Sequence, residues 1–287
     1  MQNLILNLHS RTQLVIRDSF SDHRIRLDRL AELTGAALDQ TPLHADAVFA
    51  PQNEVPSAAR GIRQWHDAAL YFLPDEKTFF LVPDEHKWQS GSDEFLVHLW
   101  QMSVEVAVIS QMYRGADLLM IHGALLDTVQ GGVLLCGQSG MGKSTSSRRW
   151  RAAGGKVFSD DMILLEFHNG EICAHPLPTW SRCRESLKGE YFPFSSTIPL
   201  RRVIALARGK EREELKSVSE TEYFMSIYSA SAFFYSTLVK VLTTEEQQFL
   251  LQQVRTKAAH LAQLTPPLAL FAHLDADLKE TLRDFLP

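Results

Sequence analysis

Residues 137–145, Gly-Gln-Ser-Gly-Met-Gly-Lys-Ser-Thr, contain the residue types that bind a polyphosphate. Glycines let successive backbone N–H groups turn inward around a phosphate without Cβ clashes. A lysine supplies a mobile positive charge, and a serine hydroxyl is a ligand for Mg²⁺. The spacing Gly-x-x-x-x-Gly-Lys-Ser meets the Walker A pattern. The sequence therefore predicts a P-loop that binds a nucleoside triphosphate, which we take to be ATP, together with Mg²⁺.

Each loop residue has an expected role. Lys143 is expected to contact the β- and γ-phosphates, Ser144 the Mg²⁺ ion, and Thr145 the α-phosphate. The residues expected to surround the phosphates are Gly137, Ser139, Gly140, Met141 and Gly142. An apolar run at 133–136 precedes the loop, and a helix predicted over 143–153 follows it. This strand–loop–helix order is the context that the motif requires, and the helix N-terminus adds a favourable dipole for anions.

Two further features flank the loop. Asp160 and Asp161 follow a short strand predicted at 157–159, and His122 lies upstream between apolar residues. Adjacent carboxylates near a triphosphate can divide two jobs, because one can hold Mg²⁺ while the other accepts the proton of an attacking hydroxyl. In isolation the pair would be interpreted as a solvated turn, and the histidine as a core residue. The nearby loop favours the functional interpretation of all three.

The segment from His122 to Glu166 resembles the catalytic domain of HPr kinase/phosphorylase and its kinase-like relatives. The matching elements are His122-Gly123, Asp127, the loop Gly-x-Ser-Gly-x-Gly-Lys-Ser, and the acidic pair, all at the intervals of that family. The resemblance implies a P-loop α/β domain related to phosphoenolpyruvate carboxykinase.

The resemblance also implies roles for the flanking residues. Asp160 would be the general base for an acceptor serine, and His122 would orient it or adjust its charge. Asp161 and Ser144 would serve the metal. Two departures disfavour HPr itself as the acceptor, and the reverse reaction: Thr145 stands where HPr kinases have a glutamate, and no Glu-x-Arg-Gly sequence follows. The chain looks like a divergent relative that phosphorylates a peptide, a protein or a small molecule.

Apolar patterns predict the elements around the motif. Strands are expected at 4–8, 14–17, 70–73, 78–82, 118–121, 124–129, 133–136, 157–159, 163–167, 172–175, 203–207 and 268–271. Helices are expected at 27–38, 92–113, 143–153, 220–241, 244–262 and from 276 onward. We place a domain boundary after residue 112. Residues 1–112 would form a small α+β domain of unknown role, which we expect to bind the acceptor, and residues 113–287 the P-loop domain.

Composition excludes several partners. Of the 287 residues, 45% are hydrophobic and 22% charged, and the net charge of −5 argues against a nucleic-acid or anionic-membrane surface. The three cysteines are too few for a disulfide scaffold. The N-terminus has no signal-peptide pattern, and no apolar stretch is long enough to span a membrane. We therefore expect a cytoplasmic protein, and self-association is left open.

Three functions are compatible with these residues. The leading one is a serine kinase that transfers the γ-phosphate of ATP to a hydroxyl. The second is a regulatory ATPase or nucleotide-binding module without a phosphoryl acceptor. The third is a carboxykinase-like enzyme that acts on a small acid. The guanine motif Asn-Lys-x-Asp and the transporter signature Leu-Ser-Gly-Gly are both missing from the sequence, which argues against a GTPase and a transporter-type ATPase.

Overall fold

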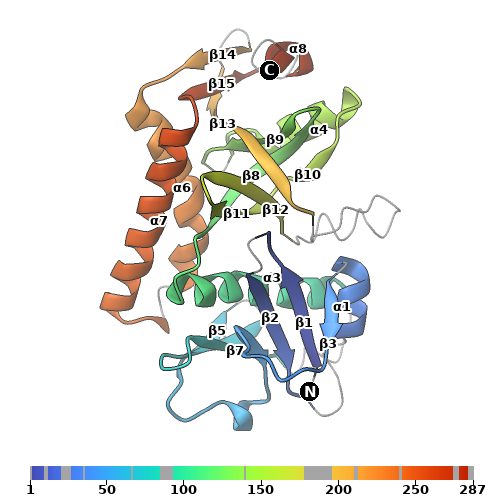
Figure 1. Cartoon of the computed structure of the whole chain (residues 1–287), viewed down its shortest axis with the longest axis vertical. Helices are drawn as coiled ribbons and strands as arrows, with labels where there is room; N and C mark the ends of the chain where they lie inside the picture. The colour runs from blue at the N-terminus through green and yellow to red at the C-terminus, as the bar shows by residue number, and fades with distance from the viewer. Residues whose placement is uncertain are drawn as a thin grey trace. The chain divides into compact units, whose positions relative to one another are not determined.

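The computed structural model describes residues 2–9, 12–20, 27–34, 36–65, 67–84, 93–138, 140–177, 196–209, 213–238, 241–273 and 278–283. The fold is mixed α/β, with two separate sheets (Figure 1). The chain divides into two compact units. Unit 1 comprises Met1–Leu118, Leu177–Ser196 and Thr237–Leu250; unit 2 comprises Leu119–Pro176, Thr197–Ser236 and Leu251–Pro287.

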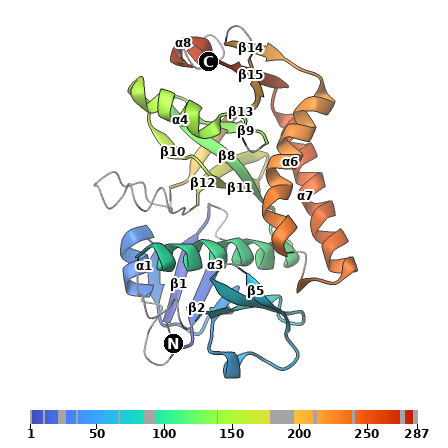
Figure 2. The same ribbon diagram turned by 180° about the vertical axis from the view of Figure 1, so that it is seen from behind.

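Unit 1 is built on a seven-stranded sheet of order β3-β1-β2-β4-β7-β6-β5. Its strands are β1 (Gln2–Asn7), β2 (Gln13–Asp18), β3 (Ala37–Asp39), β4 (Ala47–Phe49), β5 (Arg60–Trp65), β6 (Ala68–Leu73) and β7 (Thr78–Pro83). A short 3₁₀ helix, η1 (Gln52–Glu54), follows β4. Helices α1 (Leu27–Thr34) and α3 (Asp93–Tyr113) contact the sheet, and Figure 2 shows α3 running across one face of it.

A buried carboxylate joins α3 to the strands of unit 1. The side chain of Asp46 is fully buried between β2 and β4. It accepts hydrogen bonds from the backbone N–H of Val15 at 2.8 Å and from the Gln111 amide at 2.9 Å, and it pairs with the Arg114 guanidinium. Because a buried carboxylate is costly without partners, these donors determine where the end of α3 lies on the sheet.

Unit 2 is built on an eight-stranded sheet. Its strands are β8 (Leu118–Thr128), β9 (Gly131–Cys136), β10 (Val157–Ser159), β11 (Met162–His168), β12 (Glu171–Pro176), β13 (Ile198–Arg208), β14 (Glu214–Ser217) and β15 (Leu268–Ala272). The order is β10-β8-β11-β12-β13-β15-β14, and β9 pairs with both β8 and β13. The pairs β9–β13 and β13–β15 are parallel, and the part of β13 that lies between its two neighbours, Val203–Leu206, is apolar and buried.

Four helices belong wholly or mainly to unit 2: α4 (Lys143–Ala152), α6 (Glu220–Leu238), α7 (Thr244–Leu264) and α8 (Leu278–Arg283). Trp150 of α4 and Leu278 of α8 share one core with the central strands. Trp150 is 5% exposed, and Gly155 passes so close to it that a Cβ there would lie 2.3 Å from the indole nitrogen. The Lys279 ammonium lies 5.6 Å from the centre of the indole ring.

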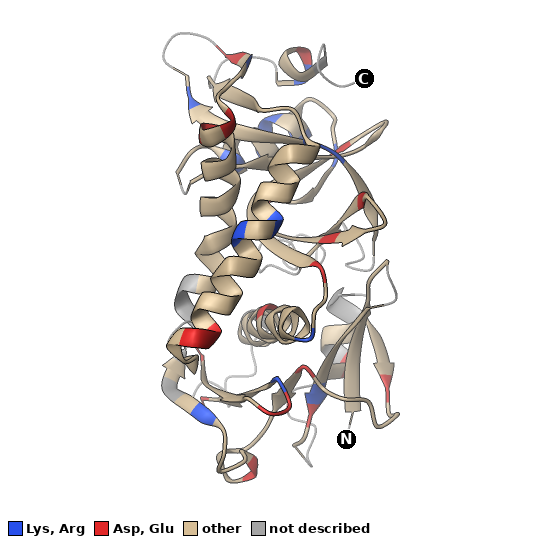
Figure 3. Cartoon of the chain, turned by 60° about the vertical axis from the view of Figure 1, so that its left-hand side comes forward, with Lys and Arg blue, Asp and Glu red and all other residues tan. Residues whose placement is uncertain are grey.

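Helices α6 and α7 lie side by side in both views (Figures 1 and 2), and each begins with a capping box. At α6, Ser219 and Glu222 exchange hydrogen bonds between side chain and backbone, and at α7 Thr243 and Glu246 do the same. Acidic residues mark the first turn of α7 in Figure 3, where they interact favourably with the helix dipole.

The structure corrects three predicted elements. The helix expected over 27–38 ends at Thr34, because Ala37–Asp39 pairs with β1 as strand β3. The two strands expected at 118–121 and 124–129 are one strand, β8, since Gly123 lets the chain pass close to Leu134 and Leu135 without interruption. The helix expected over 220–241 ends at Leu238. None of the helices in the described part of the chain is long and apolar enough to cross a membrane.

Candidate active site

The glycine loop lies between buried strand β9 and helix α4 in unit 2. Gly140 and Gly142 have φ angles of 80° and 99°, which residues with a Cβ rarely adopt. Gly142 is the residue before the first turn of α4, so the loop leads directly to a helix N-terminus. The sequence therefore needs glycine here to turn the backbone from strand to helix. Ser139, predicted to contact phosphate, lies outside the described residues.

Lys143 folds back over this loop. Its side chain is buried, and its ammonium donates to the carbonyl oxygens of Gly137 at 2.8 Å and Gln138 at 3.0 Å. Burial lowers the pKa of Lys143, while the nearby Cys136 and Asp161 act in the opposite direction. Two neutral carbonyl oxygens of the loop thus hold the ammonium, and a bound anion can replace them as hydrogen-bond acceptors.

The remaining loop residues differ in exposure. Ser144 is exposed, whereas Thr145 is half-buried and its hydroxyl accepts a hydrogen bond from Arg148 at 3.4 Å. Met141 is partly buried against the core that surrounds Trp150. The hydroxyl that the sequence predicts as a metal ligand is therefore accessible to solvent.

The side chains of His122 and Asp161 lie in contact in unit 2. Nε2 of His122, on β8, lies 3.3 Å from Oδ1 of Asp161, and the backbone N–H of Gly123 donates to the Asp161 carbonyl at 3.1 Å. Strand pairing between β8 and the start of β11 thus brings the two residues together. Asp161 also influences the pKa of Lys143, so the carboxylate lies near both His122 and the loop lysine.

Asp160 has a different partner from the one expected. The sequence-based expectation was that His122 orients Asp160, but His122 pairs with Asp161 instead. Oδ2 of Asp160 lies 3.7 Å from the Arg151 guanidinium of α4. The Asp160 side chain is 14% exposed and the Asp161 side chain 45%. The two residues lie in the bend between β10 and β11, where the chain directs their side chains to different partners.

Aromatic side chains of α6 lie against His122. The ring of Phe233 is 5.0 Å from the imidazole, and that of Phe234 is 6.2 Å away in an edge arrangement. Phe234 is buried, but Phe233 is 56% exposed. The exposed Phe233 is a site residue that the sequence analysis did not identify. The contact of an exposed aromatic ring with a histidine of a distant strand is visible only in the folded structure.

Asp127, which matched the family pattern, lies near the other end of β8. Its backbone N–H donates to the carbonyl of Lys156 at 2.9 Å. Burial raises the pKa of its carboxyl group, and Lys156 opposes this. Asp127 therefore contacts the turn before β10.

No curated protein matches the sequence. Among solved structures, the chain is similar to the HPr(Ser) kinase/phosphatase from Coxiella burnetii, with 20% sequence identity and a TM-score of 0.26. That match covers 32% of this chain and 62% of the other, so the chain spans less than two thirds of that protein's length.

A family model gives the more extensive match. The model described as SynChlorMet cassette protein ScmC matches residues 87–286, which is more than two thirds of the chain and includes the glycine loop, His122 and both aspartates. The chain therefore belongs to the ScmC family of SynChlorMet cassette proteins.

Proposed function

We propose that this protein is an ATP-dependent kinase that transfers the γ-phosphate to a serine or similar hydroxyl. The observation that carries the proposal is the convergence of three groups in unit 2: a glycine loop at a helix N-terminus, the loop lysine Lys143, and the Asp161–His122 pair. The protein takes little covalent part in phosphoryl transfer. Its catalytic effect comes mostly from positioning the reactants and stabilising the charge of the transition state.

Nucleotide binding follows from the loop. Its backbone N–H groups and the α4 dipole favour a polyphosphate. On binding, the Lys143 ammonium exchanges the neutral carbonyls of Gly137 and Gln138 for anionic phosphate oxygens, which attract its charge more strongly. The lowered pKa of Lys143 is then reversed, because the phosphates stabilise its charged form.

The acceptor hydroxyl needs a proton acceptor, and the contacts support Asp161 rather than Asp160 in this role. Asp161 is the more exposed of the two, and His122 orients its carboxylate. Asp160, whose carboxylate lies near the Arg151 guanidinium, is then the aspartate that we assign to the metal. This reverses the division of roles that the family resemblance implied, and it is directly testable by substitution.

The site residues fit Mg²⁺ bound together with a nucleotide. The described residues contain no group of three or more His, Cys, Asp or Glu side chains that could hold a metal. Mg²⁺ in phosphotransferases is commonly held by one or two protein ligands, phosphate oxygens and water, so a complete protein cage is not needed. Ser144 and Asp160 would hold the ion here. When bound, Mg²⁺ neutralises charge on the phosphates.

We propose that the acceptor is a peptide encoded by an adjacent gene, or another hydroxyl-bearing molecule made by the products of adjacent genes. The family description, a cassette protein, supports a search among adjacent genes. A regulatory ATPase, in which water replaces the acceptor, is the second candidate. It is favoured by the exposure of Asp161, because an open carboxylate also reaches water.

The deciding experiment combines nucleotide binding with mass analysis. The full chain is incubated with ATP and Mg²⁺ and with peptides encoded by neighbouring reading frames, and product mass and ADP are followed together. A gain of one phosphate on a hydroxyl residue, lost in Lys143→Met, supports the kinase. Equal ADP release with and without peptide, with no phosphorylated product, supports the ATPase. An affinity for ATP·Mg²⁺ that is unchanged in Lys143→Met overturns the nucleotide site itself.

A further inference from the structure

A pocket lies on the sheet of unit 1, and none of its lining residues belongs to the proposed nucleotide site. It has a volume of about 260 Å³ and is lined by residues of β2, β4 and β7, of the segment before β4, and of η1. Alternate residues of a strand point to opposite faces of a sheet. Ile16 and Asp18 of β2 are fully buried, whereas Arg17 and Ser19 point to the other face and line the pocket.

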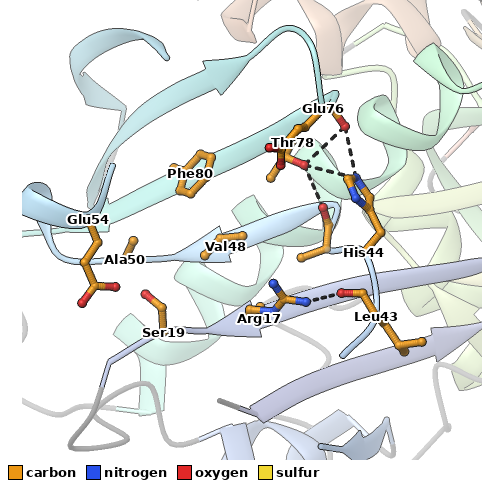
Figure 4. Close-up of a pocket in the computed structure, with 11 residues that line it drawn as sticks. Arg17, Ser19, Leu43, His44, Val48, Ala50, Glu54, Glu76, Thr78 and Phe80 are labelled. Carbon is orange, nitrogen blue, oxygen red and sulfur yellow. Dashed lines mark hydrogen bonds between the residues drawn. The ribbon is translucent and has the colours of Figure 1, made fainter. Parts of the chain in front are cut away.

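The floor of the pocket is apolar, and the Arg17 guanidinium lies to one side of it. Figure 4 shows Val48 and Phe80 between the Arg17 guanidinium and the residues at the far end of the pocket. Arg17 donates from Nε to Asn3 at 3.1 Å and from Nη2 to the Leu43 carbonyl. Both acceptors are neutral. Within the described residues no carboxylate neutralises Arg17, and its Nη1 makes no hydrogen bond.

An acidic group lies at one end of the same pocket. Glu54, in η1, is exposed, and Figure 4 places it beside Ala50 and Ser19. Its carboxylate has no hydrogen bond or ion pair within the part of the chain that the structure describes. Ser19 donates its hydroxyl hydrogen to the Phe49 carbonyl at 2.9 Å, which leaves the oxygen free to accept. One half-buried cation and one anion therefore flank an apolar floor, and neither neutralises the other.

We propose that this pocket binds an apolar α-amino acid, either free or as the C-terminal residue of a peptide. The ligand carboxylate pairs with Arg17, its N–H group donates to Glu54, and its side chain packs on Val48 and Phe80. Arginine suits this role because its planar fork binds carboxylates in a defined geometry. The volume suits an amino acid, since pockets for larger ligands span roughly 300–1,000 Å³.

Calorimetric titration of the full chain without nucleotide tests the pocket independently of the kinase proposal. The probes are L-leucine, Gly-Gly-Leu, N-acetyl-L-leucine and L-leucinamide. The first three retain the carboxylate and are expected to bind. Leucinamide lacks it and is expected to bind about tenfold more weakly or worse, because the arginine then loses its charged partner. Stronger binding of Gly-Gly-Leu than of leucine identifies a peptide end, and the reverse order identifies a free amino acid.

Two variants assign the ends of the pocket. Glu54→Lys should weaken leucine binding about tenfold, because it removes the partner of the ligand's ammonium, and should weaken N-acetyl-leucine, whose N–H is uncharged, by less. Glu171→Lys, at an exposed position of unit 2, is the matched control and should change neither. Arg17→Gln should abolish binding of every carboxylate, with Arg255→Gln as its control.

Arg17 also donates hydrogen bonds to Asn3 and Leu43, so the folding of Arg17→Gln is checked by circular dichroism. The comparison of leucine with leucinamide uses the unsubstituted protein and does not depend on this variant. Binding of leucinamide as tight as that of leucine, the lack of binding by any probe, or unchanged leucine affinity in Glu54→Lys would each overturn the assignment.

Discussion

Asp160 and Asp161 are neighbours in the chain but have different partners in space. Asp161 pairs with His122 and lies near Lys143, whereas Asp160 faces Arg151. The motif residues 137–145 could be predicted from the sequence because they are contiguous and their spacing is determined by the chemistry. The His122 partner could not, because it depends on which residue the β8–β11 pairing places opposite Gly123.

Substituting the two aspartates separately tests the assignment. Asp161→Asn should lower the rate of phosphoryl transfer by about 10²–10⁴-fold, because general-base catalysis contributes that much, while ATP·Mg²⁺ affinity is kept. Asp160→Asn should instead raise the Mg²⁺ concentration needed for half-maximal rate. Single-turnover assays across a Mg²⁺ series measure both quantities. The opposite pattern would restore Asp160 as the base.

Phe233 is expected to act through His122. Phe233→Ala removes the ring that packs against the imidazole, so His122 loses orientation and the transfer rate should fall about two- to tenfold, in line with the energy of aromatic pairs. Nucleotide affinity should not change, and Phe233→Tyr should restore the rate.

Met225→Ala is the control for Phe233→Ala, since Met225 is a similarly exposed apolar residue of the same helix. An equal loss of rate in the two variants would show that only the apolar surface of α6 matters.

At the scale of elements, strands with a continuous apolar run were predictable, and the strands that were missed are short or contain charged residues. The hairpin β6–β7 and the helices α3 and α7 follow from their patterns within a few residues. Strands β4, β5 and β14 were missed. The first is only Ala47–Phe49, and the other two contain charged residues. Such segments become strands because a neighbouring strand pairs with them, which local patterns do not reveal.

The start of α7 combines a cap with an ion pair. Glu246 completes the capping box with Thr243 and also accepts both hydrogen bonds of Arg60, each at 2.7 Å. Glu246→Gln keeps a capping side chain but loses the charge, so it should cost roughly 1 kcal/mol of unfolding free energy. Glu222→Gln at the α6 cap is the control. Urea denaturation that shows the same loss for both variants would exclude a contribution from Arg60.

At the scale of the whole molecule, unit 1 collects pieces that are distant in sequence. Arg60 and Tyr113 both bond Glu246, and the Tyr113 ring stacks on Phe249 at 5.5 Å. Residues 237–250 thus complete the unit that begins at the N-terminus. The domain boundary after residue 112 stays a prediction. Sequence patterns show where helices and strands end, but they do not show which distant segments pack into the same unit.

A fragment comparison tests this organisation. Residues 1–112 alone lack Tyr113, Glu246 and Phe249, so strands β5 and β6 should exchange their amide hydrogens faster in the fragment than in the full chain. Hydrogen exchange followed by mass spectrometry measures this peptide by peptide, and the exposed turn at Asp75 is an internal reference. Equal protection of β5 and β6 in both samples would show that the first 112 residues fold independently.

The packing of Trp150 gives α4 an optical reporter. The indole is buried in the helix that begins at Lys143, and the ammonium of Lys279 lies over its ring. Indole emission responds to nearby charge, so a small displacement of α4 when the loop lysine changes partners should alter the emission spectrum. Titration with ATP·Mg²⁺ should then shift the tryptophan fluorescence, and Trp150→Phe should remove that signal without removing binding. The protein would thereby report occupancy of its own loop without any added label.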